Sequence, residues 1–305
     1  MTAGRAAVVA GVDGSAESDR ALSWAAEEAV LRDASLHVVH CFEPLAGYQG
    51  AGLPLLHNAF LAFELAGREL LEQAVHRAET VVAGRVPVTG DMPANAPVPV
   101  FLELSRQARM IVLGATGSGG FLGMLAGSTA VAVSVHAHCP VVVVRGAIRP
   151  GGPVVVGVDG GVTSESAVGA AFDEAARRNV PLVAVHARHD HAVPPWLPAV
   201  PDENETGEGT ESDTGSDTGS DTGSDTVLGE SLAGWREKYP GVRVDAITVA
   251  DRPRHRLLDF SARGQLVVVA GRGRGGFAGM LLGSTGRALL HHARCPVLVV
   301  PVHTR

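Results

Sequence analysis

The stretch Val8-Val-Ala-Gly-Val-Asp-Gly14 returns later in the chain as Val154-Val-Val-Gly-Val-Asp-Gly160, at a spacing of 146 residues. A longer stretch, residues 117–129, returns as residues 273–285 at a spacing of 156 residues. Repeats in the same order over most of the chain indicate a duplicated domain with a net insertion in the second copy. The 305 residues suffice for two domains that each bury a core. We therefore expect one domain at residues 1–149 and another at 150–305.

Short runs of β-branched residues alternate with amphipathic stretches in each copy. Strands that are apolar throughout and separated by helices are typical of a parallel sheet that is covered on both faces. We therefore predict two tandem doubly wound α/β domains, each with a five-stranded parallel sheet and helices on both faces. In the first copy, strands are expected at 7–12, 36–41, 86–89, 110–113 and 141–144, and helices at 18–32, 60–82, 97–108 and 128–136. Ser18 is expected to cap the first helix.

The insertion in the second copy is strongly acidic. Residues 202–225 contain nine acidic and no basic residues, with a repeated Ser-Asp-Thr-Gly unit, so the net charge of −7 belongs to this segment. Because it lacks apolar residues, we predict a disordered surface loop at about 202–226. A calcium site is an alternative because Asp recurs every four residues, but the EF-hand spacing and its final Glu are missing.

Outside this segment the chain is close to neutral, which does not favour a nucleic-acid partner. No apolar run reaches the roughly 18 residues that a membrane-spanning helix needs, and residues 1–6 do not resemble a signal peptide. We therefore expect a cytoplasmic protein without a membrane partner. Cys41, Cys139 and Cys295 lie in or beside apolar runs without metal-ligand spacing, and we expect buried, reduced thiols.

A glycine-rich loop follows the expected strand at 110–113. It runs from Gly114 through Gly117 to Gly127, where Ser128 and Thr129 open a helix. In open parallel sheets, ligands bind where loops leave the carboxyl ends of strands. Glycines let backbone N–H groups approach phosphate oxygens, and a helix N-terminus with hydroxyl side chains attracts anions. The pattern predicts a site for a nucleotide phosphate chain in each copy.

Several of these residues also have alternative roles. The glycines could simply form tight turns, with Ser128 as a helix cap, and Asp13 and Asp159 could cap the turns after their strands. Residues 271–276 match GxGxxG, but the dinucleotide motif follows the first strand of a Rossmann unit rather than the fourth. The P-loop pattern GxxxxGK[ST] is absent from the sequence, and no nucleophile–base pair stands among the motif positions.

The pattern G-x2-G-x9-G-S/T after a fourth strand resembles the ATP-binding branch of the universal stress protein family, over nearly the whole chain except the acidic segment. The resemblance implies an adenine nucleotide α-hydrolase-like fold and ATP with Mg²⁺ as ligands. It places Gly11 and Asp13 beside adenosine and the backbone of Val39 beside the base. Residues expected around ribose and phosphates are Gly114, Gly117, Ser118, Gly119, Gly127, Ser128 and Thr129. The matching residues of the second copy are Gly157, Asp159, Val185, Gly273, Arg274, Gly275, Gly283, Ser284 and Thr285.

The second copy departs from the pattern at its first glycine. Ala270 stands where the first copy has Gly114, and if that position requires a positive φ, alanine costs on the order of 1 kcal/mol. Arg272 and Arg274 stand where the first copy has Thr116 and Ser118, and could pair with phosphate. We expect a second site whose affinity differs from that of the first.

Three functions are compatible with these residues. The resemblance implies a regulatory, non-enzymatic module that binds ATP in the stress response and acts on an unidentified protein partner. A slow Mg²⁺-dependent ATPase and a nucleotide-free interaction scaffold are the alternatives. The resemblance also implies that the two copies pair as a pseudo-twofold unit through their closing strands, Val141–Val144 and Val297–Val300, with a homodimer as a further option.

Overall fold

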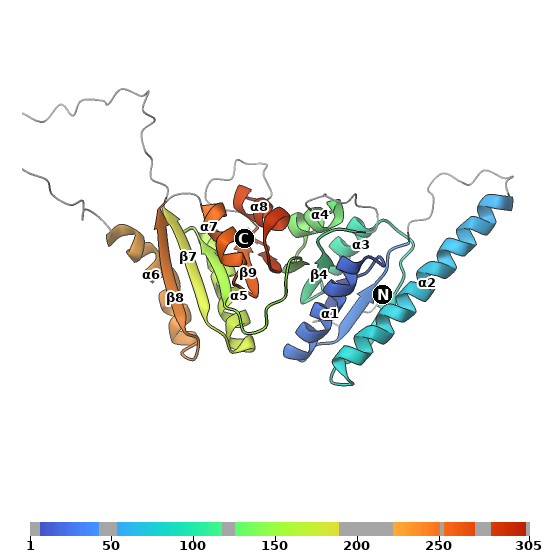
Figure 1. The fold of residues 1–305 in the computed structure, drawn as a ribbon, viewed down its shortest axis with the longest axis horizontal. Helices are drawn as coiled ribbons and strands as arrows, with labels where there is room; N and C mark the ends of the chain where they lie inside the picture. Colours follow the sequence, from blue (N-terminus) through green and yellow to red (C-terminus); the bar gives the residue numbers. More distant parts are fainter. Residues whose placement is uncertain are drawn as a thin grey trace, which may run out of the picture.

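A computed structural model describes residues 7–42, 54–117, 126–188, 222–250, 253–271 and 282–302. The two copies fold alike (Figure 1). The first contains β1 (Val8–Gly11), α1 (Ala16–Leu31), β2 (Leu36–Val39), α2 (Pro54–Val82), β3 (Val88–Asp91), α3 (Pro97–Leu104), β4 (Met110–Gly114), α4 (Ser128–His136) and β5 (Val141–Val144). The second contains β6 (Val154–Val158), α5 (Val162–Arg178), β7 (Leu182–Arg188), α6 (Thr222–Lys238), β8 (Val244–Ala250), α7 (Pro253–Ser261), β9 (Leu266–Ala270), α8 (Ser284–His292) and β10 (Val297–Val300).

The strands form one ten-stranded sheet in the order β3-β2-β1-β4-β5-β10-β9-β6-β7-β8. Pairing is parallel inside each half. The halves meet where β5 and β10 pair antiparallel, with Val142 opposite Leu298. The predicted fold class is therefore confirmed, and the closing strands pair as expected.

Helices cover both faces of the sheet. On one face, α1, α2, α5 and α6 contribute buried residues such as Trp24, Ala74, Phe172 and Leu232 to a core that runs through both halves. On the other face, α3, α4, α7 and α8 form a second core. Strands β1, β4, β5, β6, β9 and β10 are covered on both sides and are apolar throughout. The outer strands β3 and β8 are only partly buried, and each contains an Asp. Within the described ranges, no helix is long and apolar enough to span a membrane.

Several expected boundaries are wrong. The first helix starts at Ala16, and its cap is Ser15 rather than Ser18, because the Ser15 hydroxyl accepts the backbone N–H of Ser18. Helix α2 begins six residues earlier than expected, at Pro54, and α3 ends at Leu104 instead of 108. Residues 222–226 belong to α6 and not to a loop, whereas residues 202–221 lie outside the described residues.

A buried cluster of charges joins α1 to α5. Glu28 and Arg32 of α1 contact each other and their repeat counterparts Glu174 and Arg178 of α5, so that each carboxylate lies between two guanidinium groups. Both glutamate side chains are only 1% exposed. We call these four residues the charge quartet. Because its inter-helix pairs are reciprocal, it fixes how the two halves face each other on this side of the sheet.

Candidate functional site

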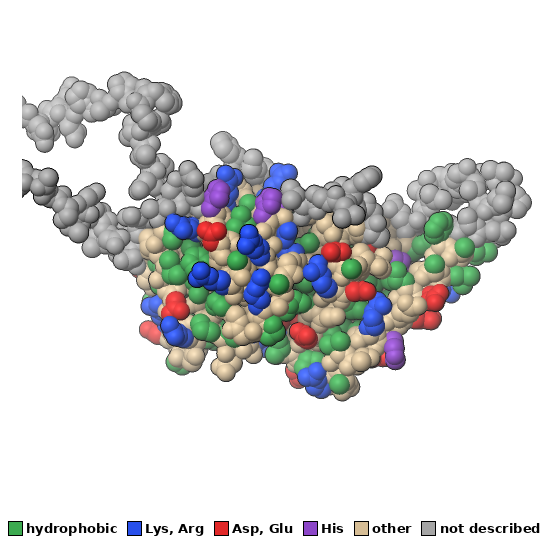
Figure 2. Space-filling view, viewed as in Figure 1, with side chains coloured by type: hydrophobic (Ala, Val, Ile, Leu, Met, Phe, Trp, Pro, Cys, Tyr) green, Lys and Arg blue, Asp and Glu red, His purple; other side chains and the backbone are tan. Residues whose placement is uncertain are grey.

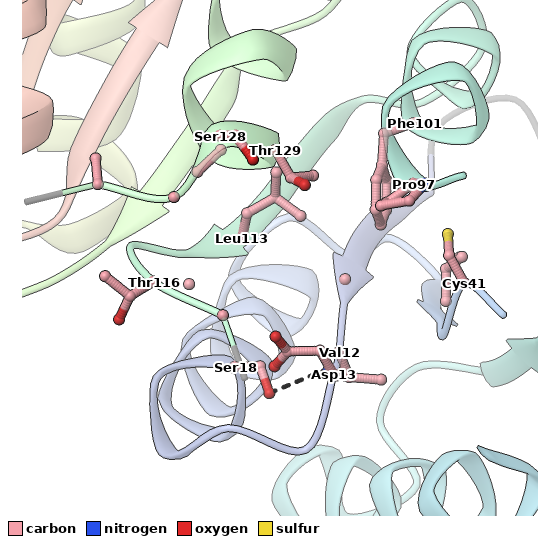
Figure 3. A pocket seen from close by; sticks show the side chains of 17 residues that line it. Val12, Asp13, Ser18, Cys41, Pro97, Phe101, Leu113, Thr116, Ser128 and Thr129 are labelled. Carbon is pink, nitrogen blue, oxygen red and sulfur yellow. Dashed lines mark hydrogen bonds between the residues drawn. The ribbon is translucent and has the colours of Figure 1, made fainter. Parts of the chain in front are cut away.

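A cavity of about 540 Å³ lies at the carboxyl ends of β1, β2 and β4 (Figure 3). Its volume is in the range of sites that hold small molecules and cofactors, about 300–1,000 Å³. The structure brings all the described residues that the sequence assigned to the first site to this cavity: Gly11, Asp13, Val39, Gly114, Gly117, Gly127, Ser128 and Thr129. Ser118 and Gly119 lie outside the described residues.

The turn after β1 forms one wall. Asp13 accepts hydrogen bonds through Oδ1 from the backbone N–H of Ser15, at 3.0 Å, and from its hydroxyl, at 2.6 Å. The Ser18 hydroxyl accepts the backbone N–H of Asp13 at 3.3 Å (Figure 3). Gly14 has a φ of +81°, which suits glycine. The turn-capping role that was an alternative for Asp13 is therefore real, and it leaves Asp13 on the cavity wall.

The glycine-rich loop approaches Asp13 closely. A Cβ atom on Gly117 would lie 2.6 Å from Oδ2 of Asp13. Further along, Gly127 is the N-cap of α4 and has no side chain to accept the first amides of the helix. This end of the cavity is suited to an anion, because it offers these N–H groups, the hydroxyls of Ser128 and Thr129 and the positive end of the helix dipole.

The opposite end is apolar. Val39, Phe101 and Leu113 belong to one hydrophobic cluster and all line the cavity. Cys41 and Pro97 line it as well (Figure 3). Burial, with a smaller contribution from Asp91, raises the pKa of the Cys41 thiol to about 12. The thiol is therefore neutral at physiological pH, and this end of the cavity suits a flat, weakly polar ring.

Two glycines of the motif have a packing role that the sequence analysis did not recognise. A Cβ atom on Gly11 would lie 2.5 Å from Cδ2 of Leu113 and 2.6 Å from Cζ of Phe101. A Cβ atom on Gly114 would lie 2.9 Å from the backbone carbon of Glu17, so Gly114 lets α1 approach β4. Gly114 is not one of the glycines with positive φ. The backbone penalty considered for Ala270 therefore does not apply.

Other lining residues escaped sequence reasoning altogether. Phe101, Leu113 and Cys41 belong to apolar stretches that look like core in a single sequence. Pro97 offered a faint signal, because Pro253 stands at the matching place in the second copy, at the start of α7. Ser18 was assigned to a cap, but it lines the cavity.

The second copy repeats the turn and the helix start. Asp159 accepts the backbone N–H of Gly161 at 2.8 Å, and Gly160 has a φ of +69°. Gly157 packs against Leu257, the counterpart of Phe101, and Val185 is buried in the middle of β7. Gly283 is the N-cap of α8, whose first residues are Ser284 and Thr285. Gly273, Arg274 and Gly275 lie outside the described residues.

The chemistry of the first cavity fits a nucleotide. The described lining residues include a single carboxylate, Asp13, and no Lys or Arg. Phosphate charge would therefore be met by backbone amides, hydroxyl groups and the α4 dipole. Among the described residues, no group of three or more His, Cys, Asp or Glu side chains could hold a metal ion by itself. A Mg²⁺ ion would take its ligands largely from phosphate oxygens, as this ion commonly does.

Comparison with known proteins agrees with this architecture. The model of the universal stress protein family matches residues 5–145 and again residues 152–301. The chain belongs to the universal stress protein family. Universal stress protein Rv2005c of Mycobacterium tuberculosis is 40% identical over 300 residues, 96% of each chain. Universal stress protein Rv2623 of the same species is 38% identical over 299 residues, 96% of this chain and 95% of the relative.

A solved universal stress protein from Archaeoglobus fulgidus shares the fold. Its TM-score is 0.67 at 17% identity, over 97% of this chain and 96% of the other. Both copies of the family domain are therefore present in one chain, as the repeats predicted. The two matched segments lie on either side of residues 146–151, close to the expected boundary between 149 and 150.

Proposed function

We propose that the chain is a regulatory nucleotide-binding module of the stress response, which binds ATP together with Mg²⁺ and passes its binding state to a protein partner. The observation that carries the proposal is the cavity with two chemically different ends. One end offers glycine backbone and the uncapped start of α4, and the other offers Val39, Phe101 and Leu113. Adenine and a phosphate chain need these two environments.

Different residues of the cavity would bind the adenine ring, the ribose and the phosphates. The apolar end would hold the adenine ring, with the backbone of Val39 at its edge. Asp13, fixed by Ser15, would accept a hydrogen bond from a ribose hydroxyl. The amides near Gly117 and Gly127 and the hydroxyls of Ser128 and Thr129 would bind the phosphates. Bound Mg²⁺ would supply charge neutralisation for the phosphate chain.

A regulatory role is favoured over catalysis by the lining of the cavity. Among its described residues, Asp13 is the one candidate general base, and Oδ1 of that carboxylate already accepts two hydrogen bonds from Ser15. Efficient hydrolysis needs a positioned base and compensating charge for the transition state. We therefore expect ATP turnover, if measured, to be far slower than the typical enzyme value of about 10 s⁻¹. The cytoplasmic location stays a prediction.

Calorimetric titration of the full chain, freed of bound ligand, tests the proposal. We expect ATP to bind with Mg²⁺, and Gly117→Val to weaken binding at the first site at least tenfold, because the new side chain enters the space between the loop and Asp13. The control is Gly241→Val, since Gly241 is exposed with nothing within 4 Å of its Cβ position. The matched change Gly273→Val tests the second site. Normal ATP binding by the double variant would refute the phosphate role of this loop.

A further inference from the structure

The outer surface of α7 and α8 carries arginines without acidic partners. Arg254 and Arg256 of α7, Arg287 of α8 and Arg294, two residues beyond the end of α8, are exposed, and none forms an ion pair with another described residue. Asp259 is the sole acidic residue on the two helices. The helices are neighbours that cover the same core, and Figure 2 shows Arg and His side chains gathered over them. We call the four arginines the basic face.

The placement of Arg254 and Arg256 is unfavourable for the helix itself. Both lie in the first turn of α7, which starts at Pro253 and has no acidic residue there. The N-terminus of a helix carries the positive end of its dipole, so cations at this position repel it. An anionic partner at the basic face would relieve this repulsion.

The duplicated domain provides an internal comparison. In the first copy, the counterparts of Arg254, Arg256 and Arg287 are the uncharged residues Val98, Val100 and Val131. The fold therefore does not require arginines on these helices. The basic face occurs in the same copy that carries the acidic segment of residues 202–225, with nine acidic and no basic residues.

The strand that precedes the acidic segment ends close to the start of α7. Strand β7 ends at Arg188, which lies opposite Ala250 of β8, and α7 begins three residues after Ala250. Residues 189–221 join β7 to α6. At about 3.3 Å per extended residue, a connection of this length can reach any point on the nine-residue helices α7 and α8.

We propose that the basic face is a docking surface for residues 202–221 of the same chain, which hold eight of the nine acids of the acidic segment. The remaining residues, 222–225, already belong to α6, which packs on the other face of the sheet. The attraction is electrostatic, between carboxylates of the segment and the four arginines. Docking within one chain benefits from a high effective concentration, so it competes with any other acidic peptide. Because the charges are exposed, the interaction weakens as salt is added.

A labelled peptide of residues 202–221 tests this proposal by fluorescence anisotropy at low salt. The first receptor is the full-length chain with the eight acids of residues 202–221 changed to Asn or Gln, which leaves the basic face free. The second is the unaltered chain. We expect the peptide to bind the neutralised chain, to bind the unaltered chain at least tenfold more weakly, and to dissociate at 0.5 M salt. Equal affinity for both chains, or no binding to either, would overturn the proposal.

Paired variants of the neutralised chain assign the surface. Arg254→Ser with Arg256→Ser should weaken peptide binding at least tenfold without lowering the melting temperature, because cations at a helix start do not stabilise it. The control is Arg68→Ser with Arg77→Ser on α2, which changes the net charge equally. An equal loss in the control would contradict the assignment. Arg287→Ser on α8 should also weaken peptide binding. This single variant tests the same surface if the Arg254→Ser/Arg256→Ser chain does not fold.

Two further measurements distinguish other occupants. Sedimentation of the unaltered chain should show no association that depends on both salt and the segment, since such association would make a second copy the occupant. Saturating ATP should leave peptide binding unchanged. Displacement of the peptide by ATP, with weaker ATP binding in the Arg254→Ser/Arg256→Ser chain, would instead assign these arginines to the second nucleotide site.

Discussion

Single positions decide how closely the elements of the first site approach each other. At Gly114 a side chain would meet the backbone of Glu17, whereas the second copy accommodates Ala270 at the same place, half-buried against the core. The requirement for glycine therefore comes from the approach of one helix in one copy. The sequence motif assigns both positions to phosphate binding. It cannot distinguish a glycine needed for phosphate contact from one needed for the close approach of a helix.

The two positions predict losses of different size for reciprocal changes. Gly114→Ala should lower the free energy of unfolding by about 1–3 kcal/mol, because α1 must move away from β4. Ala270→Gly should cost no more than about 1 kcal/mol, the usual difference between the two residues. Urea unfolding of both variants checks this, and equal losses would show that Ala270 is packed as tightly as Gly114.

How far the site could be predicted follows from the same residues. Gly117, Gly127, Ser128 and Asp13 carry recognisable backbone or polar chemistry, and the repeat marked them twice. Phe101 and Leu113 reach the cavity only because α3 and β4 come together in space. Their apolar side chains have no feature in the sequence that distinguishes a ligand contact from core.

At the scale of elements, the charge quartet is the feature that no pattern predicted. Glu28 and Arg32 look like an ordinary exposed i,i+4 pair of a helix, and so do Glu174 and Arg178. They are buried because α1 and α5 face each other. Burial and the nearby Glu28 raise the pKa of Glu174 to about 7, although Arg32 and Arg178 act in the opposite direction.

Removal of one guanidinium group should show how strongly the arginines stabilise the buried carboxylates. Arg32→Met should lower stability by about 3–5 kcal/mol, the usual result of breaking a buried ion pair. A carboxyl whose pKa is raised in the folded state holds its proton longer than in the unfolded state, so stability falls as pH rises from about 4.5 towards 7. The loss in Arg32→Met should therefore be larger at pH 8 than at pH 5, in urea titrations.

Arg77→Met is the control, because the pair of Arg77 with Asp19 is nearly half exposed on both sides. Exposed pairs contribute about 0–1 kcal/mol, so this variant should change stability little at either pH. A loss in Arg32→Met that does not depend on pH would contradict the argument that Arg32 offsets the charge of the buried glutamates.

For the whole molecule, the pairing of β5 with β10 could be predicted from their unbroken valine-rich sequences, since an exposed apolar edge strand invites pairing. The sequence did not predict that the two strands pair antiparallel, nor that the charge quartet joins the two halves. Both depend on how the halves lie against each other. The start of α6 could not be predicted either, because residues 222–226, which are polar and contain Gly223 and Asp225, are typical of a loop and yet begin the helix.

Separately produced halves test this joint. Residues 1–149 and 150–305 should associate one to one when mixed, because each half alone exposes a valine-rich edge and half of the quartet. Residues 1–149 alone should form dimers, since β5 can pair antiparallel with itself and Glu28 and Arg32 can face a second copy of themselves. Sedimentation equilibrium distinguishes these states, and two stable monomers that ignore each other would refute the expectation.

Because both sides of the β5–β10 joint belong to one polypeptide, dilution cannot take it apart. Two identical subunits must keep every surface residue acceptable in both positions, since one gene encodes them both. Covalent fusion removes that restriction, and each half can change without altering its mate. The two copies differ in this way where α3 has valines and α7 has arginines at the matching positions. The chain is therefore a pseudo-symmetric pair of domains whose surfaces can differ.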